Sequence, residues 1–297
     1  MTIPTRKGVG PSCVSLPPGP WATVLDFLVE RMPDISRHEW TARLQDQSVL
    51  NEVGEPMTLA QAYTPHRRIY YYRHIANEAA LPFEATIVHE DAHLLVADKP
   101  HFMPVTPSGR YVQQSLLVQL KNRTGCDALV PLHRIDRETA GLVLFSKRAA
   151  DRDAYHAMFR QQRMHKTYHA VAAYRPELVW PRVHQSRLVP GEPFFRMQEV
   201  PGTANSETRM ALLRVDGHRA LYQLEPLSGK RHQLRVHMLA LGLPIEGDQF
   251  YPQVQRGPDE PEDFSQALQL LAQRIAFVDP VTGQDVAFES QQQLLLR

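Results

Sequence analysis

The segment HRIDRETAGLVLF, residues 133–145, combines a charged part with an apolar run. Its last four residues form a continuous apolar run, which is typical of a strand buried on both faces. Just before that run, Asp136 lies in a polar segment with an arginine on either side. An ionised carboxylate held at a loop end can attack an electrophile or remove a proton. An Asp that only accepts hydrogen bonds from loop amides fits the same pattern, so other segments must decide between the two interpretations.

Short apolar runs on both sides of this strand predict a sheet with few helices. Gly or Pro turns separate most of them, which favours antiparallel neighbours over strand–helix–strand crossovers. We expect strands at 86–89, 94–97, 142–145, 167–174, 182–188, 194–198, 208–215, 220–227, 275–278 and 286–288, and helices at 114–121, 149–162 and 232–241. The predicted fold class is therefore α+β, with a mixed, largely antiparallel sheet and flanking helices.

The amino-terminal part of the chain differs in pattern from the rest. Residues 1–20 are rich in Pro and Gly and lack apolar periodicity, which predicts a flexible tail. Residues 21–78 predict a small α+β module, with a helix near its start and a second helix after Ser36 as N-cap. The large sheet would then occupy residues 84–297 as a separate domain.

Composition describes an ordinary globular protein whose positive charge is local. The 297 residues are 43% hydrophobic and 22% charged, with a net charge of +1, so binding of a polyanion through bulk charge is excluded. Residues 133–175 nevertheless hold nine Lys or Arg against four acids. Two cysteines, Cys13 and Cys126, exclude a disulfide framework and a four-cysteine zinc site. Because no run of about 18 apolar residues occurs, we expect a cytoplasmic protein that does not bind membranes.

Three further segments carry residues of chemical interest. KTY at 166–168 opens a predicted strand, GKRHQLRVH at 229–237 combines a turn glycine with three cations, and PIEGD follows at 244–248. With HRIDRETAG, these segments resemble, in the same order, the HRLDR-x-TSG, K-x-Y, GR-x-HQIR-x-H and PI-x-GD elements of the RluA-type family of RNA pseudouridine synthases. The resemblance covers about residues 84–290, and it implies the catalytic fold of that family.

The resemblance also implies roles for individual residues. Asp136 falls on the family's catalytic aspartate, Tyr168 on the tyrosine that stacks on the target base, and Arg235 on the arginine that pairs with the aspartate. Arg134 falls near the gap that an extruded nucleotide leaves. Small departures occur at Ile135, Ala140 and Lys230, where the family has Leu, Ser and Arg. We expect five basic residues to bind RNA, namely Arg134, Arg137, Lys166, Lys230 and Arg231.

The implied activity is the isomerisation of specific uridines in structured RNA, rRNA or tRNA, to pseudouridine. This reaction breaks N1–C1′ and makes C5–C1′ without redox change, so we expect no cofactor and no metal. Asp136 can add covalently or remove a ribose proton, and the sequence leaves both routes open. Tyr168 offers a π-face for the uracil and a phenol that can assist removal of the C5 proton. Structured RNA is the expected partner, and the protein is expected to be a monomer.

Other interpretations remain open at this point. The main alternative is a non-catalytic RNA-binding protein on the same fold, and a further one is hydrolysis by Asp136 or by zinc at His89 and His93. HEDAH at 89–93 satisfies the zinc-protease pattern, but flanking strands predict a hairpin turn there rather than the required helix. Residues 21–78 faintly resemble the S4 RNA-binding domain. Their near-equal numbers of acidic and basic residues leave a degenerate S4 module and a stabilising extension equally open.

Overall fold

The computed structural model describes residues 3–73, 75, 77–257, 260 and 263–296. The chain divides into two compact units. The small unit comprises Met1–Ala79, Pro107–Gln113 and Val118–Asp127, and the large unit comprises Ala80–Thr106, Gln114–Leu117 and Ala128–Arg297. The helix α3, Leu116–Thr124, contributes residues to both units.

In the small unit, two helices pack against a three-stranded sheet. The helices are α1, Val24–Arg31, and α2, Arg37–Gln45, and the sheet has the order β1-β3-β2. Ser36 caps α2 as predicted, because its hydroxyl accepts the Glu39 N–H while the Glu39 carboxylate accepts the Ser36 N–H. The core of this unit includes the fully buried Trp40.

The prediction of a flexible tail over residues 1–20 is wrong for its second half. Strand β1, Ser12–Ser15, pairs antiparallel with β3, Arg68–Tyr71, which in turn pairs with β2, Val49–Leu50. Leu16, directly after β1, is buried in the core of the small unit. The partner strand lies more than fifty residues along the chain, so local composition could not indicate this pairing. Whether residues 21–78 form an S4-like module stays a prediction.

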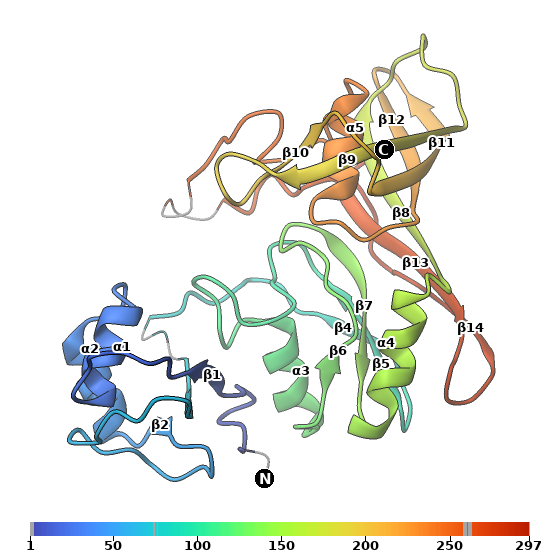
Figure 1. Cartoon of the computed structure of the whole chain (residues 1–297). Helices are drawn as coiled ribbons and strands as arrows, with labels where there is room; N and C mark the ends of the chain where they lie inside the picture. Colours follow the sequence, from blue (N-terminus) through green and yellow to red (C-terminus); the bar gives the residue numbers. More distant parts are fainter. Residues whose placement is uncertain (1–2, 74, 76, 258–259, 261–262, 297) are drawn as a thin grey trace. The chain divides into compact units, whose positions relative to one another are not determined.

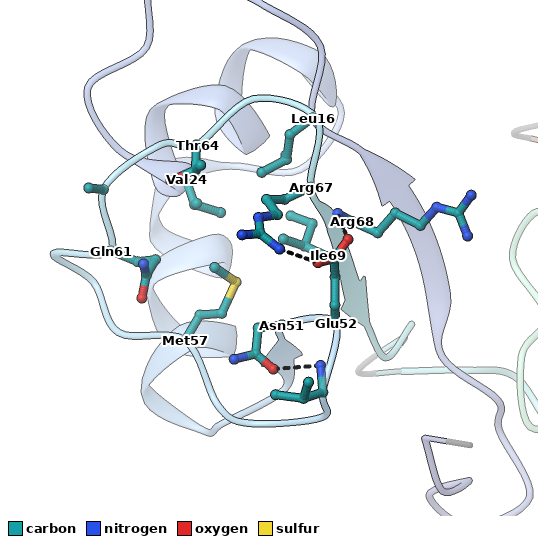
Figure 2. Close-up of a pocket in the computed structure, with 12 residues that line it drawn as sticks. Leu16, Val24, Asn51, Glu52, Met57, Gln61, Thr64, Arg67, Arg68 and Ile69 are labelled. Atoms are coloured by element: carbon teal, nitrogen blue, oxygen red, sulfur yellow. Dashed lines mark hydrogen bonds and ion pairs between the residues drawn. The ribbon is translucent and has the colours of Figure 1, made fainter. Parts of the chain in front are cut away.

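The small unit contains a pocket of about 280 Å³ (Figure 2). Apolar side chains such as Leu16, Met57 and Ile69 form part of its lining. The polar part of the lining includes Glu52, whose carboxylate bonds both the Arg67 side chain (3.1 Å) and the backbone N–H of Arg68 (3.0 Å). These polar groups therefore satisfy one another, and none of them identifies a ligand.

The large unit is built on an 11-stranded sheet (Figure 1). Its strands follow the order β10 (Met197–Val200), β9 (Arg182–Pro190), β11 (Ser206–Asp216), β12 (Arg219–Pro226), β8 (Met164–Ala173), β13 (Leu270–Val278), β7 (Ala140–Ser146), β5 (Leu94–Lys99) and β4 (Thr86–Glu90). Two more strands lie off this path, β14 (Asp285–Glu289) beside β13 and β6 (Val130–Pro131) beside β7. All pairs are antiparallel except β7 with β13, so the predicted mixed, largely antiparallel α+β class is confirmed.

The parallel contact between β7 and β13 depends on Gly141. It pairs with Ala272, and its φ of +112° is one that residues with a side chain rarely adopt. A Cβ placed on Gly141 would lie 2.3 Å from the carbonyl oxygen of Ala272, so only glycine lets the two backbones approach this closely. The glycine that ends HRIDRETAG therefore joins the two parts of the sheet.

Helices cover each part of this sheet. Helix α4, Arg152–Arg160, follows a 3₁₀ turn at Ala149–Asp151 and packs Tyr155 and Met158 against the core of β5, β7 and β13. Helix α5, Gln233–Ala240, packs Leu234 and Met238 against the core of β8, β11 and β12. None of the helices among the described residues combines the length and apolar character needed to cross a bilayer.

Most of the predicted elements are present, with ends shifted by a few residues. The clearest difference is the strand predicted at 194–198, which begins only at Met197. Before it, Arg196 donates its N–H to the carbonyl of Pro193 at 2.8 Å and closes a turn. The aromatic side chains at the start of that segment therefore belong to a loop.

Candidate active site

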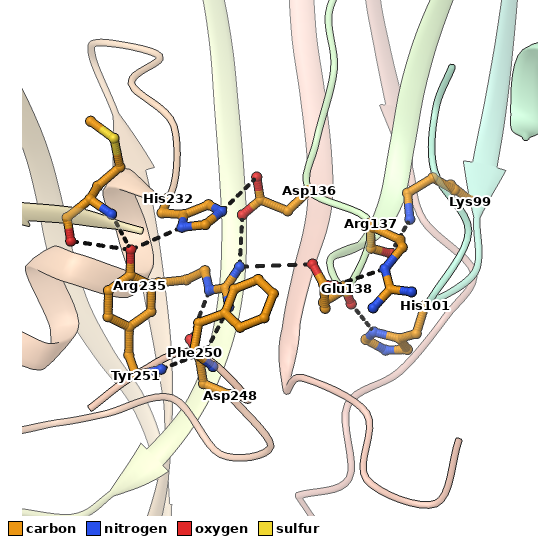
Figure 3. Close-up of polar contacts among 11 residues, drawn as sticks. Lys99, His101, Asp136, Arg137, Glu138, His232, Arg235, Asp248, Phe250 and Tyr251 are labelled. Atoms are coloured by element: carbon orange, nitrogen blue, oxygen red, sulfur yellow. Dashed lines mark hydrogen bonds and ion pairs between the residues drawn. The ribbon is translucent and has the colours of Figure 1, made fainter. Parts of the chain in front are cut away.

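Asp136 lies in the loop between β6 and β7, at the entrance to the buried strand. Its carbonyl accepts the Thr139 N–H at 3.2 Å, which closes a turn just before β7. Its Oδ2 accepts a hydrogen bond from Nη1 of Arg235 at 3.3 Å, across 99 positions of sequence (Figure 3). The Asp136 side chain keeps 23% exposure, so the carboxylate is accessible from solvent.

Arg235, on α5, is a buried cation surrounded by acids. Only 1% of its side chain is exposed, and its Nε and Nη2 donate to Oδ2 and Oδ1 of Asp248 at 2.7 and 2.6 Å. Burial opposes the charged guanidinium, but the hydrogen bond to Asp248 and the charges of Asp248, Asp136 and Glu138 outweigh it and raise the pKa of Arg235. Such a bidentate pair fixes the plane of the guanidinium, which leaves Nη1 directed at Asp136.

Asp248 is a member of this cluster to which the sequence assigned no role. Its Oδ1 also accepts the backbone N–H groups of Phe250 and Tyr251, at 2.9 and 3.1 Å. The preceding Gly247 has a φ of +74°, and a Cβ there would lie 2.2 Å from the carbonyl oxygen of Ala267. PIEGD therefore provides the glycine that permits the turn and the carboxylate that holds Arg235. The PIEGD motif was therefore the feature of the sequence from which a role for Asp248 could have been predicted.

Two aromatic rings lie near the guanidinium, and an imidazole contacts one of them. The ring centroids of Phe250 and Tyr251 lie 5.1 and 5.3 Å from Cζ of Arg235, within cation–π range. His232 bonds the Tyr251 hydroxyl through Nδ1 at 2.9 Å, and its Nε2 lies 4.0 Å from Oδ1 of Asp136. Its backbone is left-handed, with a φ of 53°, which is uncommon outside glycine and recurs at functional sites. Burial lowers the pKa of His232 although Asp136 opposes this, so the ring is neutral near pH 7.

A second buried cation, Lys99 at the end of β5, lies behind the loop of Asp136. Its Nζ donates to the carbonyls of Pro100 and Arg137 at 2.9 and 3.0 Å. Burial lowers the pKa of Lys99 to about 7 although the charges of Glu138 and Asp136 oppose this. Because the ammonium bonds the Arg137 carbonyl, Lys99 fixes the backbone directly after Asp136. The sequence indicated no role for this lysine.

Tyr168 lies on β8, in the middle of the large sheet. It pairs with Leu224 of β12 on one side and with Ala272 of β13 on the other. Burial, with a further contribution from the negative charge of Asp136, raises the pKa of Tyr168. The structure thus places the phenol within electrostatic range of the Asp136 carboxylate and keeps it protonated at neutral pH.

The basic residues expected to bind RNA have different surroundings. Arg134 and Lys230 are exposed. Arg137 donates from Nε to Oε1 of Glu138 at 2.9 Å, which holds it within the cluster. Lys166 is half-buried, and burial lowers its pKa. Arg231 uses Nη2 to bond the carbonyls of Phe194 and Arg196, so part of its hydrogen-bonding capacity holds a loop.

The H-E-x-x-H pattern does not form a helix. It spans the end of β4 and the turn into β5, as the sequence predicted. His89 bonds Asp91 at 3.1 Å, and His93 bonds Asp151 at 2.9 Å, so the two histidines have separate partners. This arrangement is that of a hairpin and not of a zinc-protease helix.

Within the described ranges, one group of three side chains has the spacing of metal ligands, His184, Glu199 and His237. His237 Nε2 faces the hydroxyls of Ser186 and Ser206 at 3.1 and 3.0 Å. His237 Nδ1 lies 2.9 Å from the Thr208 hydroxyl, so both ring nitrogens of His237 already have hydroxyl partners within the protein.

Comparison with known proteins identifies the family. The sequence pattern described as RNA pseudouridylate synthase matches residues 93–240. The chain is 31% identical over 209 residues to the dual-specificity RNA pseudouridine synthase RluA of Haemophilus influenzae, covering 69% of this chain and 91% of that protein. The chain belongs to the RluA-type family of RNA pseudouridine synthases. It is also 32% identical over 194 residues to the pseudouridylate synthase RPUSD2 of Homo sapiens, covering 63% of this chain and 34% of that protein.

Solved structures of pseudouridylate synthases share the fold. Human RNA pseudouridylate synthase domain containing 1 matches with a TM-score of 0.57 and 22% identity, over 70% of this chain and 84% of that one. Human RNA pseudouridylate synthase domain containing 4 matches with a TM-score of 0.54 and 24% identity, over 71% of this chain and 88% of that one. The predicted family and fold are therefore confirmed. As a member of this family, the chain is an RNA-modifying isomerase.

Proposed function

We propose that this enzyme isomerises specific uridines of structured rRNA or tRNA to pseudouridine without a cofactor, with Asp136 as the catalytic carboxylate. The observation that carries the proposal is the contact between the solvent-accessible Asp136 and the buried Arg235, itself fixed by Asp248. The partial exposure of Asp136 leaves its carboxylate open to a substrate, while the buried guanidinium keeps it oriented. Here that exposed carboxylate is the group that meets the ribose.

The chemistry needs little beyond such a carboxylate. The N1–C1′ bond breaks, the base turns, the C5–C1′ bond forms, and a proton leaves C5 while N1 gains one. Asp136 would begin this sequence by adding to C1′ or by removing a ribose proton so that the base departs. Arg235 acts as a positioning residue on either route, because its Nη1 orients the carboxylate and stabilises its negative charge.

We assign Tyr168 primarily to stacking on the uracil. Its ring offers a π-face to the base, and burial together with the charge of Asp136 raises its pKa and keeps the phenol neutral. A neutral phenol donates a hydrogen bond readily but is a poor base for the C5 proton. Loss of the hydroxyl in Tyr168→Phe should therefore reduce the rate less than loss of the ring in Tyr168→Ala.

Binding would require the target nucleotide to leave its helix. Extrusion of a base costs a few kcal/mol of stacking, and Arg134, which is exposed near Asp136 in sequence, would occupy the vacated space. Lys230, Arg137, Lys166 and Arg231 would contact phosphates around it. We also propose that the enzyme acts as a cytoplasmic monomer, which light scattering of the purified protein and fractionation of cells would test.

The test of the proposal is restoration of missing pseudouridines. RNA from cells that lack the gene is incubated with purified enzyme in the presence of EDTA, and pseudouridines are mapped before and after. We expect one or a few uridines of rRNA or tRNA to be converted. No conversion in any RNA would contradict the proposed substrate class. Because EDTA also removes the Mg²⁺ that stabilises folded RNA, the RNA is kept folded with monovalent salt, and conversion only without EDTA in that salt would contradict the cofactor-free reaction.

A further inference from the structure

One large aromatic side chain of the large unit is almost completely exposed. Phe194, in the loop between β9 and β10, has 81% of its surface accessible, the highest value among the exposed large hydrophobic residues described. Single exposed apolar residues are common and need no explanation by themselves. Phe194 differs from them because it begins a series of ring contacts that leads to the catalytic cluster.

This series runs from solvent to Arg235. Phe194 contacts Phe195 with ring centroids 5.6 Å apart, and Phe195 contacts Phe250 at 5.0 Å. The Phe250 ring in turn faces the Arg235 guanidinium at 5.1 Å, and Arg235 bonds Asp136 (Figure 3). The loop that carries Phe194 is therefore continuous with the wall of the site.

The loop is held in place by polar contacts. Nη2 of Arg231 donates to the carbonyls of Phe194 and Arg196 at 2.9 and 3.0 Å. Gly191 donates its N–H to the Arg196 carbonyl at 3.1 Å, and Arg196 donates from Nη2 to the carbonyl of Pro252 at 2.8 Å. A ring presented by a pre-organised loop loses little conformational freedom when it binds a partner.

We propose that Phe194, supported by Phe195, is a stacking platform for an RNA base adjacent to the extruded uridine. Aromatic rings interleaved with cations bind single-stranded nucleic acid, because every base has a π-face and every phosphate a negative charge. The cation at this platform is Arg231, whose guanidinium bonds the Phe194 carbonyl, and the exposed Lys230 precedes it in the chain. The guanidinium of Arg196, from the same loop, lies against Tyr251 and Pro252. The charge of Arg231 and Lys230 favours an RNA strand over an apolar protein surface as the occupant.

This inference deepens the proposed function and depends on it. If a base adjacent to the target stacks on Phe194, then recognition extends beyond the uridine itself to the nucleotides that flank it. Phe194 would contribute to binding of the strand and not to the chemical step. Its removal should therefore change KM rather than kcat.

The experiment measures kcat and KM for release of tritium from RNA that is labelled at uridine C5 and taken from cells lacking the gene. Loss of one stacked base corresponds to a weakening of about tenfold, so we expect Phe194→Ala to raise KM about tenfold with little change in kcat. Phe194→Trp, which keeps a π-face, should behave as wild type. An unchanged KM for Phe194→Ala, or an equal loss for Phe194→Trp, would overturn the inference.

Val179→Ala is the matched control. Val179 is 80% exposed in the loop before β9, whereas Phe194 lies in the loop after it. A strand of nine residues separates the two loops by about 30 Å, so we expect no effect on KM. An inactive wild-type enzyme would count against the proposed function, whereas an active wild type with an unaffected Phe194→Ala variant would count against the platform alone. A dimer in light scattering that Phe194→Ala abolishes would identify a second copy as the occupant and would also overturn the inference.

Discussion

Arg235 determines the arrangement of the site because one buried cation is shared among three carboxylates. Asp248 holds it through two hydrogen bonds, Asp136 accepts a third, and Glu138 lies 3.9 Å away. Only Asp136 among these acids is partly exposed. The buried Asp248 and Glu138 therefore balance the charge of the guanidinium, and Asp136 is the carboxylate that a substrate can reach.

Asp248→Asn tests this division of roles. The variant keeps the size of the side chain but removes the charge that balances Arg235, and loss of one partner of a buried ion pair costs about 3–5 kcal/mol. We expect urea denaturation to show a loss of stability of this order, together with a lower kcat. A variant within about 1 kcal/mol of wild type would contradict the buried pairing.

Lys99 provides a second test, which uses the pH dependence of the free energy of unfolding. Burial lowers its pKa from 10.5 to about 7 in the folded chain, so between these values the unfolded chain binds more protons. The free energy of unfolding should then rise with pH across this window, by about 1.4 kcal/mol per pH unit from this group. This gain in stability is complete above 10.5, the pKa of Lys99 in the unfolded chain, and it is lost as the pH falls toward 7.

Comparison of wild type with Lys99→Met isolates the contribution of this lysine. Urea denaturation near pH 7.5 and near pH 9 should show the wild type gaining stability relative to the variant as the pH rises. The variant also loses the hydrogen bonds to the carbonyls of Pro100 and Arg137, so only the change in the difference between the two pH values reports on the titration. A difference that is the same at both pH values would contradict a lysine that deprotonates near pH 7.

The sequence predicted which residues lie in the site, but it did not predict the contacts that hold their side chains in place. HRIDR and GKRHQLR contain Asp136 and Arg235, and the structure brings the two side chains together. Local pattern could not show that Asp248 binds the same guanidinium, because the contact exists only after the turn at Gly247 has formed. Nor could it show that Arg231 bonds a loop 35 positions earlier.

At the scale of elements, the join between β7 and β13 holds the sheet together. Gly141→Ala would place a methyl group 2.3 Å from the Ala272 carbonyl oxygen, so the two strands must separate. We expect a loss of stability of more than about 2 kcal/mol, measured by urea denaturation. Gly217→Ala is the control, since Gly217 also has a positive φ, of +58°, but has nothing within 4 Å of the added methyl. Equal losses in both variants would contradict the steric argument.

Elements with strong local signals were predictable, and those that depend on distant partners were not. The buried run LVLF, the amphipathic segment of α4 and the capping residue Ser36 all gave the correct element. Strand β1 has a weak apolar pattern and is stabilised by pairing with β3, so its sequence alone suggested a tail. The FFR segment at residues 194–196, before β10, contains strand-forming residues, but hydrogen bonds from Arg231 hold it as a loop.

At the scale of the whole molecule, folding of the large sheet assembles the site from segments far apart in the chain. The loop before β7 supplies Asp136, β8 supplies Tyr168, and α5 supplies Arg235. Family membership establishes the class of enzyme, whereas the roles of these three residues are what the proposed function adds. Asp136 is the residue on which that proposal depends most.

The most direct test is therefore the release of tritium from uridine C5 by wild type and Asp136→Asn under single-turnover conditions. RNA binding by both proteins, measured by fluorescence anisotropy, serves as the control for folding. We predict that the variant binds RNA as wild type does but that its rate falls by at least about 10³-fold, since the carboxylate starts the reaction. Release by Asp136→Asn at the wild-type rate would contradict the catalytic role of Asp136.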